Sequence, residues 1–242
     1  MNVFVAGATG VIGRPLVTLL VRAGHSVTGS TRSAAKAADI SALGATPAVV
    51  DAFDAAALTQ AVAAARPQVV IHQLTDLPDS SDPASMAASR ARNSKLRIEG
   101  TANLVAAARA AGAKRLVAQS IAFIYAPGLT PHRETDPLMS GEGDSPDALS
   151  ARGVRALEDG VMGAAGLEGI VLRYGRLYGP GTWFDKPGGP GPLTTGAAAQ
   201  AALLAVSRGA PGIYNIAEDD GAVSIEKARR DLGFDPAFRL QA

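Results

Sequence analysis

The apolar residues of this chain gather in short runs, and the stretches between the runs are alanine-rich with polar residues at helical spacing. Short apolar runs predict buried strands, and the longer amphipathic stretches predict helices. The alternation of the two predicts βαβ units and a parallel sheet covered by helices on both faces. The predicted strands are Val3–Ala6, Ser26–Ser30, Ala48–Val50, Val69–His72, Leu116–Gln119, Ile170–Arg173 and Ile213–Ile216.

The helices predicted between these strands are Ile12–Ala23, Ala34–Leu43, Ala55–Ala65, Ala84–Ala111, Leu149–Ala165, Ala197–Ser207 and Ser224–Leu232. Gly24, Gly44 and Gly112 each follow a predicted helix directly, where glycine commonly ends the helix in a left-handed conformation. Asp54 precedes the third helix. We expect it to cap that helix, because its carboxylate can accept from the free N–H groups of the first turn.

Three glycines follow the first predicted strand at the spacing Gly7-x-x-Gly10-x-x-Gly13. Gly7 can turn the chain sharply, Gly10 lets the backbone approach a pyrophosphate, and Gly13 allows the next helix to pack closely on the strand. The N-terminus of that helix offers free N–H groups to an anion. We therefore predict a doubly wound Rossmann fold whose dinucleotide site includes Gly7, Thr9, Gly10, Val11, Ile12 and Gly13.

Composition limits the functions open to this chain. Its 242 residues, with 47% hydrophobic content, can bury a substantial core, and a formal net charge of +1 gives no reason to expect nucleic acid or an anionic membrane as partner. The lack of cysteine excludes thiolate chemistry, and His25, His72 and His132 lie too far apart to suggest a metal site. No signal peptide is visible, and no apolar run reaches the ~20 residues of a membrane helix. We expect a cytoplasmic protein without a metal.

The residues after the second strand are expected to select the cofactor. In sheets of this kind an acidic residue here binds the ribose 2′-hydroxyl of NAD, whereas an arginine accommodates the 2′-phosphate of NADP. The chain has Thr31-Arg32-Ser33 at this place and no acid. We therefore predict NADP, with Thr31, Arg32 and Ser33 around the phosphate. The alternative is that Arg32 is a solvated loop cation.

Several motifs, in order along the chain, resemble those of the extended short-chain dehydrogenases/reductases, a family of nucleotide-sugar epimerases, dehydratases and reductases. The matching segments are Gly7–Gly13, Val50–Asp54, Val69–Gln73, Glu99–Leu104, Leu172–Gly181 and Lys227–Pro236. The cofactor contacts that the resemblance implies are Asp51 and Ala52 for the adenine, Gln73 and Leu74 for the floor near the ribose, and Tyr174 and Leu177 for the nicotinamide end. We expect His72 to be a buried core histidine rather than a catalyst.

The catalytic part of the resemblance is incomplete. Members of the family carry Tyr-x-x-x-Lys on the long helix after the fifth strand, where the tyrosine moves a proton and the lysine lowers its pKa. Aligning Glu158 with the acid that usually follows this motif places Ser150 at the tyrosine position and Val154 at the lysine position. The remaining catalytic candidates are Ser120, which matches the family's substrate-binding serine or threonine, and Tyr125 on the same loop. The alternative for Tyr125 is a pocket wall.

The C-terminal part of the chain is shorter than in most members of this family. After Gly179–Gly181, a stretch rich in glycine and proline leads within a few residues to the helix that begins at Ala197. We predict an NADP-binding Rossmann core over residues 1–174 and a contracted, irregular substrate region over residues 175–242, together one compact unit. Such a site fits a small substrate better than a nucleotide sugar. By analogy, the long helices would form the face of a homodimer.

Three functions are consistent with these features. The first, which the retained serine and the Arg173-Tyr174 segment favour, is an NADP-dependent oxidoreductase of a small carbonyl or hydroxyl compound. The second is a non-catalytic NADP-binding protein that reports dinucleotide state to a partner. The third is a redox-neutral epimerase or dehydratase, which the missing tyrosine and lysine weaken.

Overall fold

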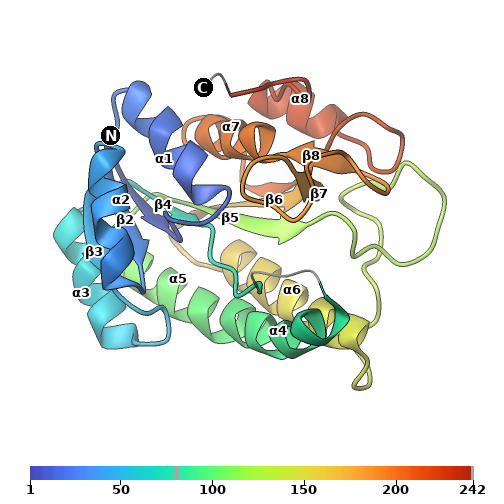
Figure 1. The fold of residues 1–242 in the computed structure, drawn as a ribbon, viewed down its shortest axis with the longest axis horizontal. Coiled ribbons are helices and arrows are strands. Elements are labelled where there is room, and N and C mark those ends of the chain that lie inside the picture. The colour runs from blue at the N-terminus through green and yellow to red at the C-terminus, as the bar shows by residue number, and fades with distance from the viewer. Residues whose placement is uncertain (79–81, 241–242) are drawn as a thin grey trace.

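The structure is a computed structural model, which describes residues 1–78 and 82–240. Seven strands form one parallel sheet in the order β3-β2-β1-β4-β5-β6-β9, and helices cover both faces (Figure 1). The strands are β1 (Asn2–Ala6), β2 (Ser26–Thr31), β3 (Thr46–Val49), β4 (Val69–His72), β5 (Arg115–Ile121), β6 (Glu168–Tyr174) and β9 (Gly212–Ile216). The strand order reverses between β1 and β4. Ligands of open parallel sheets bind outside the carboxyl ends of the strands at such a point.

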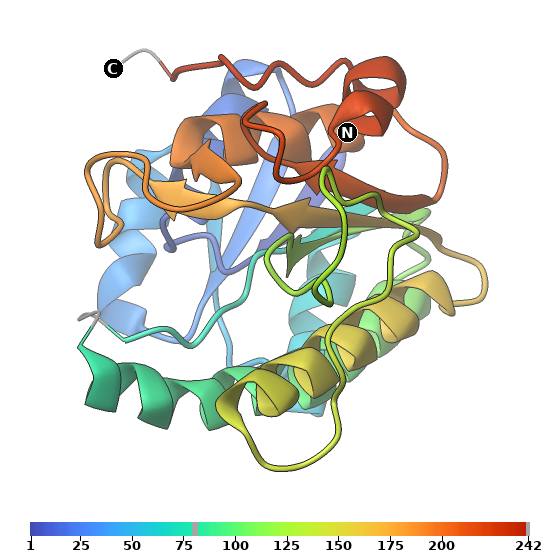
Figure 2. The same cartoon turned by 90° about the vertical axis from the view of Figure 1, so that its right-hand side faces the viewer.

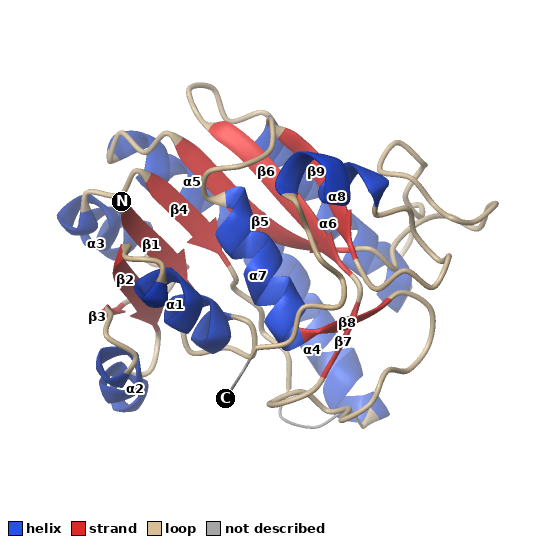
Figure 3. Cartoon of the chain, turned by 90° about the horizontal axis from the view of Figure 1, so that it is seen from above, coloured by secondary structure: helices blue, strands red, loops and turns tan. Residues whose placement is uncertain are grey.

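The helices form one layer on each side of the sheet. They are α1 (Gly13–Arg22), α2 (Ala37–Ala42), α3 (Ala55–Ala65), α4 (Pro83–Lys95), α5 (Thr101–Ala110), α6 (Pro146–Met162), α7 (Thr195–Ala205) and α8 (Glu226–Leu232). Helices α1 and α7 lie side by side on one face, and α3, α5 and α6 lie on the other (Figures 1 and 3). Alternate residues of β1 serve the two layers: Val3 and Val5 pack with Leu16, while Phe4 packs with Leu104.

The predicted fold class is confirmed. Each predicted strand and helix is present, and Gly24, Gly44 and Gly112 all have the positive φ expected at helix ends. The predicted cap is also present, because Asp54 Oδ1 accepts from the N–H of Ala57 at 2.9 Å. The pattern of apolar positions therefore identified the main elements correctly.

Two local features differ from the prediction. The single helix predicted over Ala84–Ala111 is α4 and α5 joined by a π turn over Leu96–Gly100, which a helical pattern does not reveal because the chain stays coiled. The short parallel pair β7 (Arg176–Tyr178) and β8 (Pro192–Thr194) was not predicted, because strands this short carry no periodic signal.

The C-terminal region returns to the sheet that the rest of the chain builds. It supplies the edge strand β9, which pairs with β6, and α7, which packs beside α1 (Figure 2). Between β7 and β8, residues 179–191 form an irregular connection. That this region is contracted stays a prediction. The division at residue 174 stays a prediction, since the sheet continues across it.

A buried histidine joins the end of β4 to the first residue of α5, directly after the π turn. His72 is fully buried, its Nε2 lies 3.0 Å from Thr101 Oγ1, and its Nδ1 accepts from the N–H of Leu74 at 3.2 Å. Burial, followed by the positive charge of Arg97, lowers the pKa of His72 from 6.5 to about 4. The imidazole is therefore neutral at neutral pH, which agrees with the structural role expected for it.

This pKa predicts an acid-sensitive stability. Between pH 6.5 and about 4 the unfolded chain protonates His72 and the folded chain does not, so the free energy of unfolding falls as the pH falls through this window. The full effect is about 3 kcal/mol, from ~1.4 kcal/mol per pKa unit. Urea unfolding at a series of pH values should show a flatter profile for His72→Gln than for the unmodified protein. Parallel profiles would contradict this account.

Candidate active site

The glycine turn after β1 is shaped for a ligand. Gly7 has φ +88°, and a Cβ there would lie 2.7 Å from the carbonyl oxygen of Gln73; a Cβ on Gly13 would collide with the carbonyl of Gly7. At Gly10 the nearest atom would lie 3.5 Å away, an ordinary contact. The fold itself therefore requires glycine at positions 7 and 13 but not at position 10, where the missing side chain leaves room for phosphates.

The helix that starts at this turn has no competing anion of its own. Helix α1 has no side-chain cap and no acidic residue in its first turn, so no side chain of the helix itself occupies its N-terminal N–H groups. Thr9, Val11 and Ile12 complete the turn between β1 and α1. Together these features fit the pyrophosphate of a dinucleotide.

A positively charged rim lies at the end of β2. Thr31 is buried, and its Oγ1 accepts from the N–H of Ser33 at 3.2 Å, which fixes the chain on either side of Arg32. The Arg32 side chain is 63% exposed, and its Nη2 lies 3.2 Å from Asp76 Oδ1. The other oxygen of Asp76 lies 3.2 Å from Nε of Arg92. Two arginines, Arg32 and Arg92, thus share the Asp76 carboxylate where the 2′-phosphate of NADP is predicted to bind.

The residues predicted to bind adenine follow β3. Asp51 is exposed, and its Oδ1 accepts from the N–H of Phe53 at 2.9 Å. Ala52 is buried, and its carbonyl accepts from Nδ2 of Asn103 in α5 at 2.9 Å. The loop is therefore held by both residues, while Asp51 itself stays exposed.

A buried polar pair crosses the floor of the site, between the end of β4 and the end of β6. Gln73 Nε2 donates to the hydroxyl of Tyr174 at 3.1 Å, and burial raises the pKa of this tyrosine. The other amide atom, Gln73 Oε1, is buried without a partner among the described residues. A buried acceptor of this kind normally has a partner, so Gln73 Oε1 fits a donor group of a bound ligand. Leu74 follows Gln73, and its carbonyl accepts from Gln119 at 2.9 Å, while Leu177 lies on β7.

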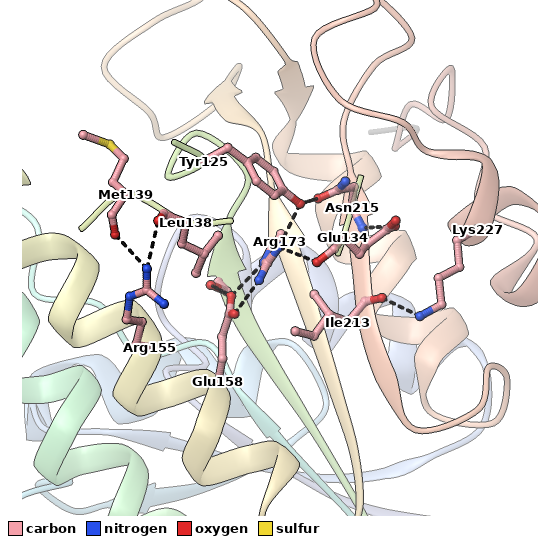
Figure 4. Close-up of polar contacts among 11 residues, drawn as sticks. Tyr125, Glu134, Leu138, Met139, Arg155, Glu158, Arg173, Ile213, Asn215 and Lys227 are labelled. Carbon is pink, nitrogen blue, oxygen red and sulfur yellow. Dashed lines mark hydrogen bonds and ion pairs between the residues drawn. The ribbon is translucent and has the colours of Figure 1, made fainter. Parts of the chain in front are cut away.

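Helix α6 carries no tyrosine–lysine pair. Ser150 donates to the carbonyl of Pro146 within its own helix at 3.0 Å, and Val154 is fully buried against Ile124 and Ala151. Arg155, the residue after Val154, donates to the carbonyls of Leu138 and Met139 at 2.8 and 2.9 Å (Figure 4).

Ser120 and Tyr125 lie in one buried network, centred on an ion pair between Arg173 of β6 and Glu158 of α6. Figure 4 shows Tyr125 beside this ion pair. Arg173 contacts both carboxylate oxygens, at 2.9 and 2.7 Å. Ser120 Oγ donates to Glu158 Oε1 at 2.7 Å. Tyr125 donates to Asn215 Oδ1 at 2.7 Å and accepts from Arg173 Nη1 at 2.8 Å.

These contacts give both hydroxyl groups a structural partner. Ser120 is 2% exposed and its proton points at a carboxylate. Burial raises the pKa of Tyr125, although the charge and hydrogen bond of Arg173 act in the opposite direction. The hydroxyl of Tyr125 is therefore a poor acid near neutral pH. The catalytic roles of Ser120 and Tyr125 stay predictions.

A pocket of about 220 Å³ opens beyond the carboxyl ends of β5 and β6. Its walls include Ala122 and Phe123 after β5, Arg176 after β6, and His132 from the intervening loop. A larger depression of about 570 Å³, around Ala113, lies at the amino ends of β5 and β6, and therefore away from the carboxyl ends where ligands bind.

Sequence reasoning missed two features of this pocket. The His132 ring stacks on the Tyr125 ring, with centroids 4.9 Å apart, and its Nδ1 lies 3.2 Å from Asp136 Oδ2. Arg176 lies over the ring of Phe123. The four-residue spacing of His132 and Asp136 could have suggested their contact from the sequence. Phe123 and Arg176 are far apart in the sequence, so no local pattern indicates that they meet.

Residues 1–78 and 82–240 contain no cluster of three or more side chains suited to a metal ion. In the same ranges no helix is long and apolar enough to cross a bilayer.

Comparison with known proteins agrees with the fold. The model of the NAD dependent epimerase/dehydratase family matches residues 3–205. A 3-diazoavenalumate denitrifying reductase from a Streptomyces species is 42% identical over 266 residues, covering 100% of this chain and 85% of that protein.

Two solved structures illustrate the similarity in fold. A UDP-glucose 4-epimerase from Thermotoga maritima, with UDP-glucose, matches with a TM-score of 0.80 and 18% identity, covering 99% of this chain and 94% of its own. A yeast methylglyoxal/isovaleraldehyde reductase complexed with NADPH matches with a TM-score of 0.72 and 18% identity, covering 90% of this chain and 78% of its own. At these identities the structures show the fold alone.

The family match spans the glycine turn, the strand ends and α6, and the relative identified by sequence is a reductase. The protein is thus an enzyme of the oxidoreductase or epimerase type that uses a nicotinamide dinucleotide. The chain belongs to the NAD dependent epimerase/dehydratase family.

Proposed function

We propose that this protein is an NADP-dependent reductase of a small molecule, and that its preferred hydride acceptor is an aryl diazonium compound rather than a ketone or aldehyde. The observation that carries this proposal is helix α6, where Ser150 and Val154 stand at the positions of the proton-transferring pair. Val154 is sealed among apolar side chains and Ser150 is bonded within its own helix, so neither supplies a proton to a substrate.

The lack of a proton donor slows hydride transfer to a carbonyl but not to an aryl diazonium ion. Reduction of a carbonyl leaves negative charge on oxygen, and a positioned acid typically contributes ~10²- to 10⁴-fold to the rate. An aryl diazonium carbon that accepts a hydride gains a C–H bond, while the electron pair of the C–N bond leaves with N₂. Cation and hydride give a neutral arene, and no proton is needed. NADPH, when bound, supplies the hydride.

The 42% identical relative supports this substrate class. Its name describes a reductase that removes nitrogen from a diazo compound, and the similarity extends over the whole of this chain. The proton-transfer roles predicted for Ser120 and Tyr125 are needed only if the acceptor is a carbonyl. The contracted connection over residues 179–191 suits a small substrate in either case.

The residues at the end of β2 support NADP over NAD. Arg32 is exposed, it is held at the rim by Asp76, and no carboxylate follows β2 at the position that would bind a 2′-hydroxyl. The chain's own part in the reaction is then to hold the phosphates at Gly10 and α1 and to orient the reacting end beside Gln73 and Tyr174.

The cofactor preference is tested by titration. NADPH should bind the unmodified protein more tightly than NADH, and Arg32→Ala should weaken NADPH binding roughly tenfold or more while leaving NADH unchanged, because a charge-assisted contact to phosphate is lost. Arg22→Ala, at the far end of α1, is the matched control and should leave both affinities as they were. Equal affinities of the unmodified protein for NADPH and NADH would refute the NADP assignment.

The hydride acceptor is tested with a substrate panel that compares aryl diazonium salts with small ketones and aldehydes. We expect enzyme-dependent NADPH oxidation with the diazonium salts, transfer of deuterium from nicotinamide C4 to the ring carbon by mass spectrometry, and much slower turnover of carbonyls. Ser120→Ala and Tyr125→Phe should change the diazonium rate less than about threefold, since no acid is required.

Reactions without enzyme correct for direct reduction of the diazonium salts, and thermal unfolding checks that each variant is folded. Fast carbonyl reduction that falls with both substitutions would restore the carbonyl assignment and the proton roles of Ser120 and Tyr125. Tight NADPH binding with no oxidation by any substrate would instead indicate the non-catalytic alternative.

A further inference from the structure

An arginine without an anionic partner lies at the pocket beyond β5 and β6. Arg176, the first residue of β7, is exposed, and its guanidinium carbon lies 4.7 Å from the centroid of the Phe123 ring. Phe123 is itself 43% exposed. Across residues 1–78 and 82–240, no side chain forms a hydrogen bond or ion pair with the Arg176 guanidinium.

Several contacts fix the position of this arginine. The N–H of Arg176 donates to the carbonyl of Gly191 at 2.7 Å, and β7 pairs with β8. A Cβ at Gly189 would lie 3.2 Å from Arg176 Cδ, so the glycine leaves room for the arginine stem. The Phe123 ring then supports the planar head group. The guanidinium is thus held in place before any anion binds, which reduces the entropy lost on binding.

The charges around the pocket favour an anion. Its titratable lining residues are Arg176, His132 and Tyr125, and no carboxylate lines it. Two carboxylates lie outside the lining and already have partners: Asp136 contacts His132, and Asp220 accepts from the N–H groups of Gly191 and Ala222. The Tyr125 hydroxyl is bonded to Arg173 and Asn215. Apolar walls complete the cavity, which at about 220 Å³ lies below the roughly 300–1,000 Å³ of drug-sized sites. The pocket therefore suits one end of a small anionic molecule.

We infer that this pocket binds the carboxylate of an aromatic or conjugated acid, with Arg176 as the residue that receives it and Phe123 as its support. The inference rests on the proposed reductase function, because a substrate anchored here extends past Ala122 and Gly175 toward the strand ends where hydride transfer would occur. A planar guanidinium can bind a carboxylate through two parallel hydrogen bonds. Arg176 would thus select acids over neutral analogues of the same shape.

The inference is tested by binding rather than turnover. Cinnamate and its neutral isostere cinnamamide are titrated calorimetrically into the protein saturated with NADP⁺. Cinnamate should bind at least tenfold more tightly than cinnamamide, and Arg176→Gln should reduce cinnamate affinity roughly 10- to 100-fold, to the level of the amide. Arg176→Lys should recover only part of the loss, because a lysine cannot form the bidentate contact.

Arg133→Gln is the matched control, since Arg133 is exposed on the same loop as His132 but does not line the pocket. It should leave cinnamate binding within twofold, and Arg176→Gln should leave NADP⁺ affinity within twofold. Equal binding of cinnamate and cinnamamide, or unchanged cinnamate binding in Arg176→Gln, overturns the inference even if diazonium salts are reduced. Arg176-dependent binding of cinnamate without diazonium reduction would support the pocket assignment and reject the proposed acceptor.

Discussion

The buried ion pair between Arg173 and Glu158 holds together the part of the molecule on which the site depends. Both side chains are almost fully enclosed, at 3% and 5% exposure, and the guanidinium contacts both carboxylate oxygens. Removing one partner of such a pair typically costs about 3–5 kcal/mol, because an uncompensated charge is left in the interior. The pair therefore fixes α6 against β6 in one arrangement, whatever its net contribution to stability.

The remaining contacts of this network extend the constraint to the loop after β5 and to the edge strand. Tyr125 connects Arg173 to Asn215 of β9, and Glu134 accepts from Arg173 through its carbonyl and from the N–H of Asn215 through its side chain. The loop that carries Phe123 and His132 is thus anchored to the sheet at several points. A rigid loop of this kind can present a preformed pocket.

The same network explains why the presence of Ser120 does not by itself imply that it acts on a substrate carbonyl. Ser120 is retained, but its hydroxyl is bonded to Glu158, and α6 has an apolar side chain at the lysine position. A site with a nicotinamide cofactor and no acid can still transfer a hydride, provided that the acceptor needs no proton. Under the function proposed above, the missing pair would restrict the hydride acceptors to those that need no proton.

The sequence by itself determined the parallel sheet, the order of its elements, the glycine turn and the Asp54 cap, because each depends on local periodicity or on the conformational freedom of one residue. It also showed directly that α6 lacks the tyrosine and the lysine.

Only the tertiary structure decided which side chains meet. Gln73 reaches Tyr174 across 101 positions, Tyr125 reaches Asn215 across 90, and Phe123 supports Arg176, all through strand pairings that no local pattern specifies. Those pairings place the Ser120 hydroxyl against the Glu158 carboxylate and leave the Arg176 guanidinium without an anionic partner among the described residues. The chemical role of a hydroxyl or a guanidinium depends on the groups packed around it.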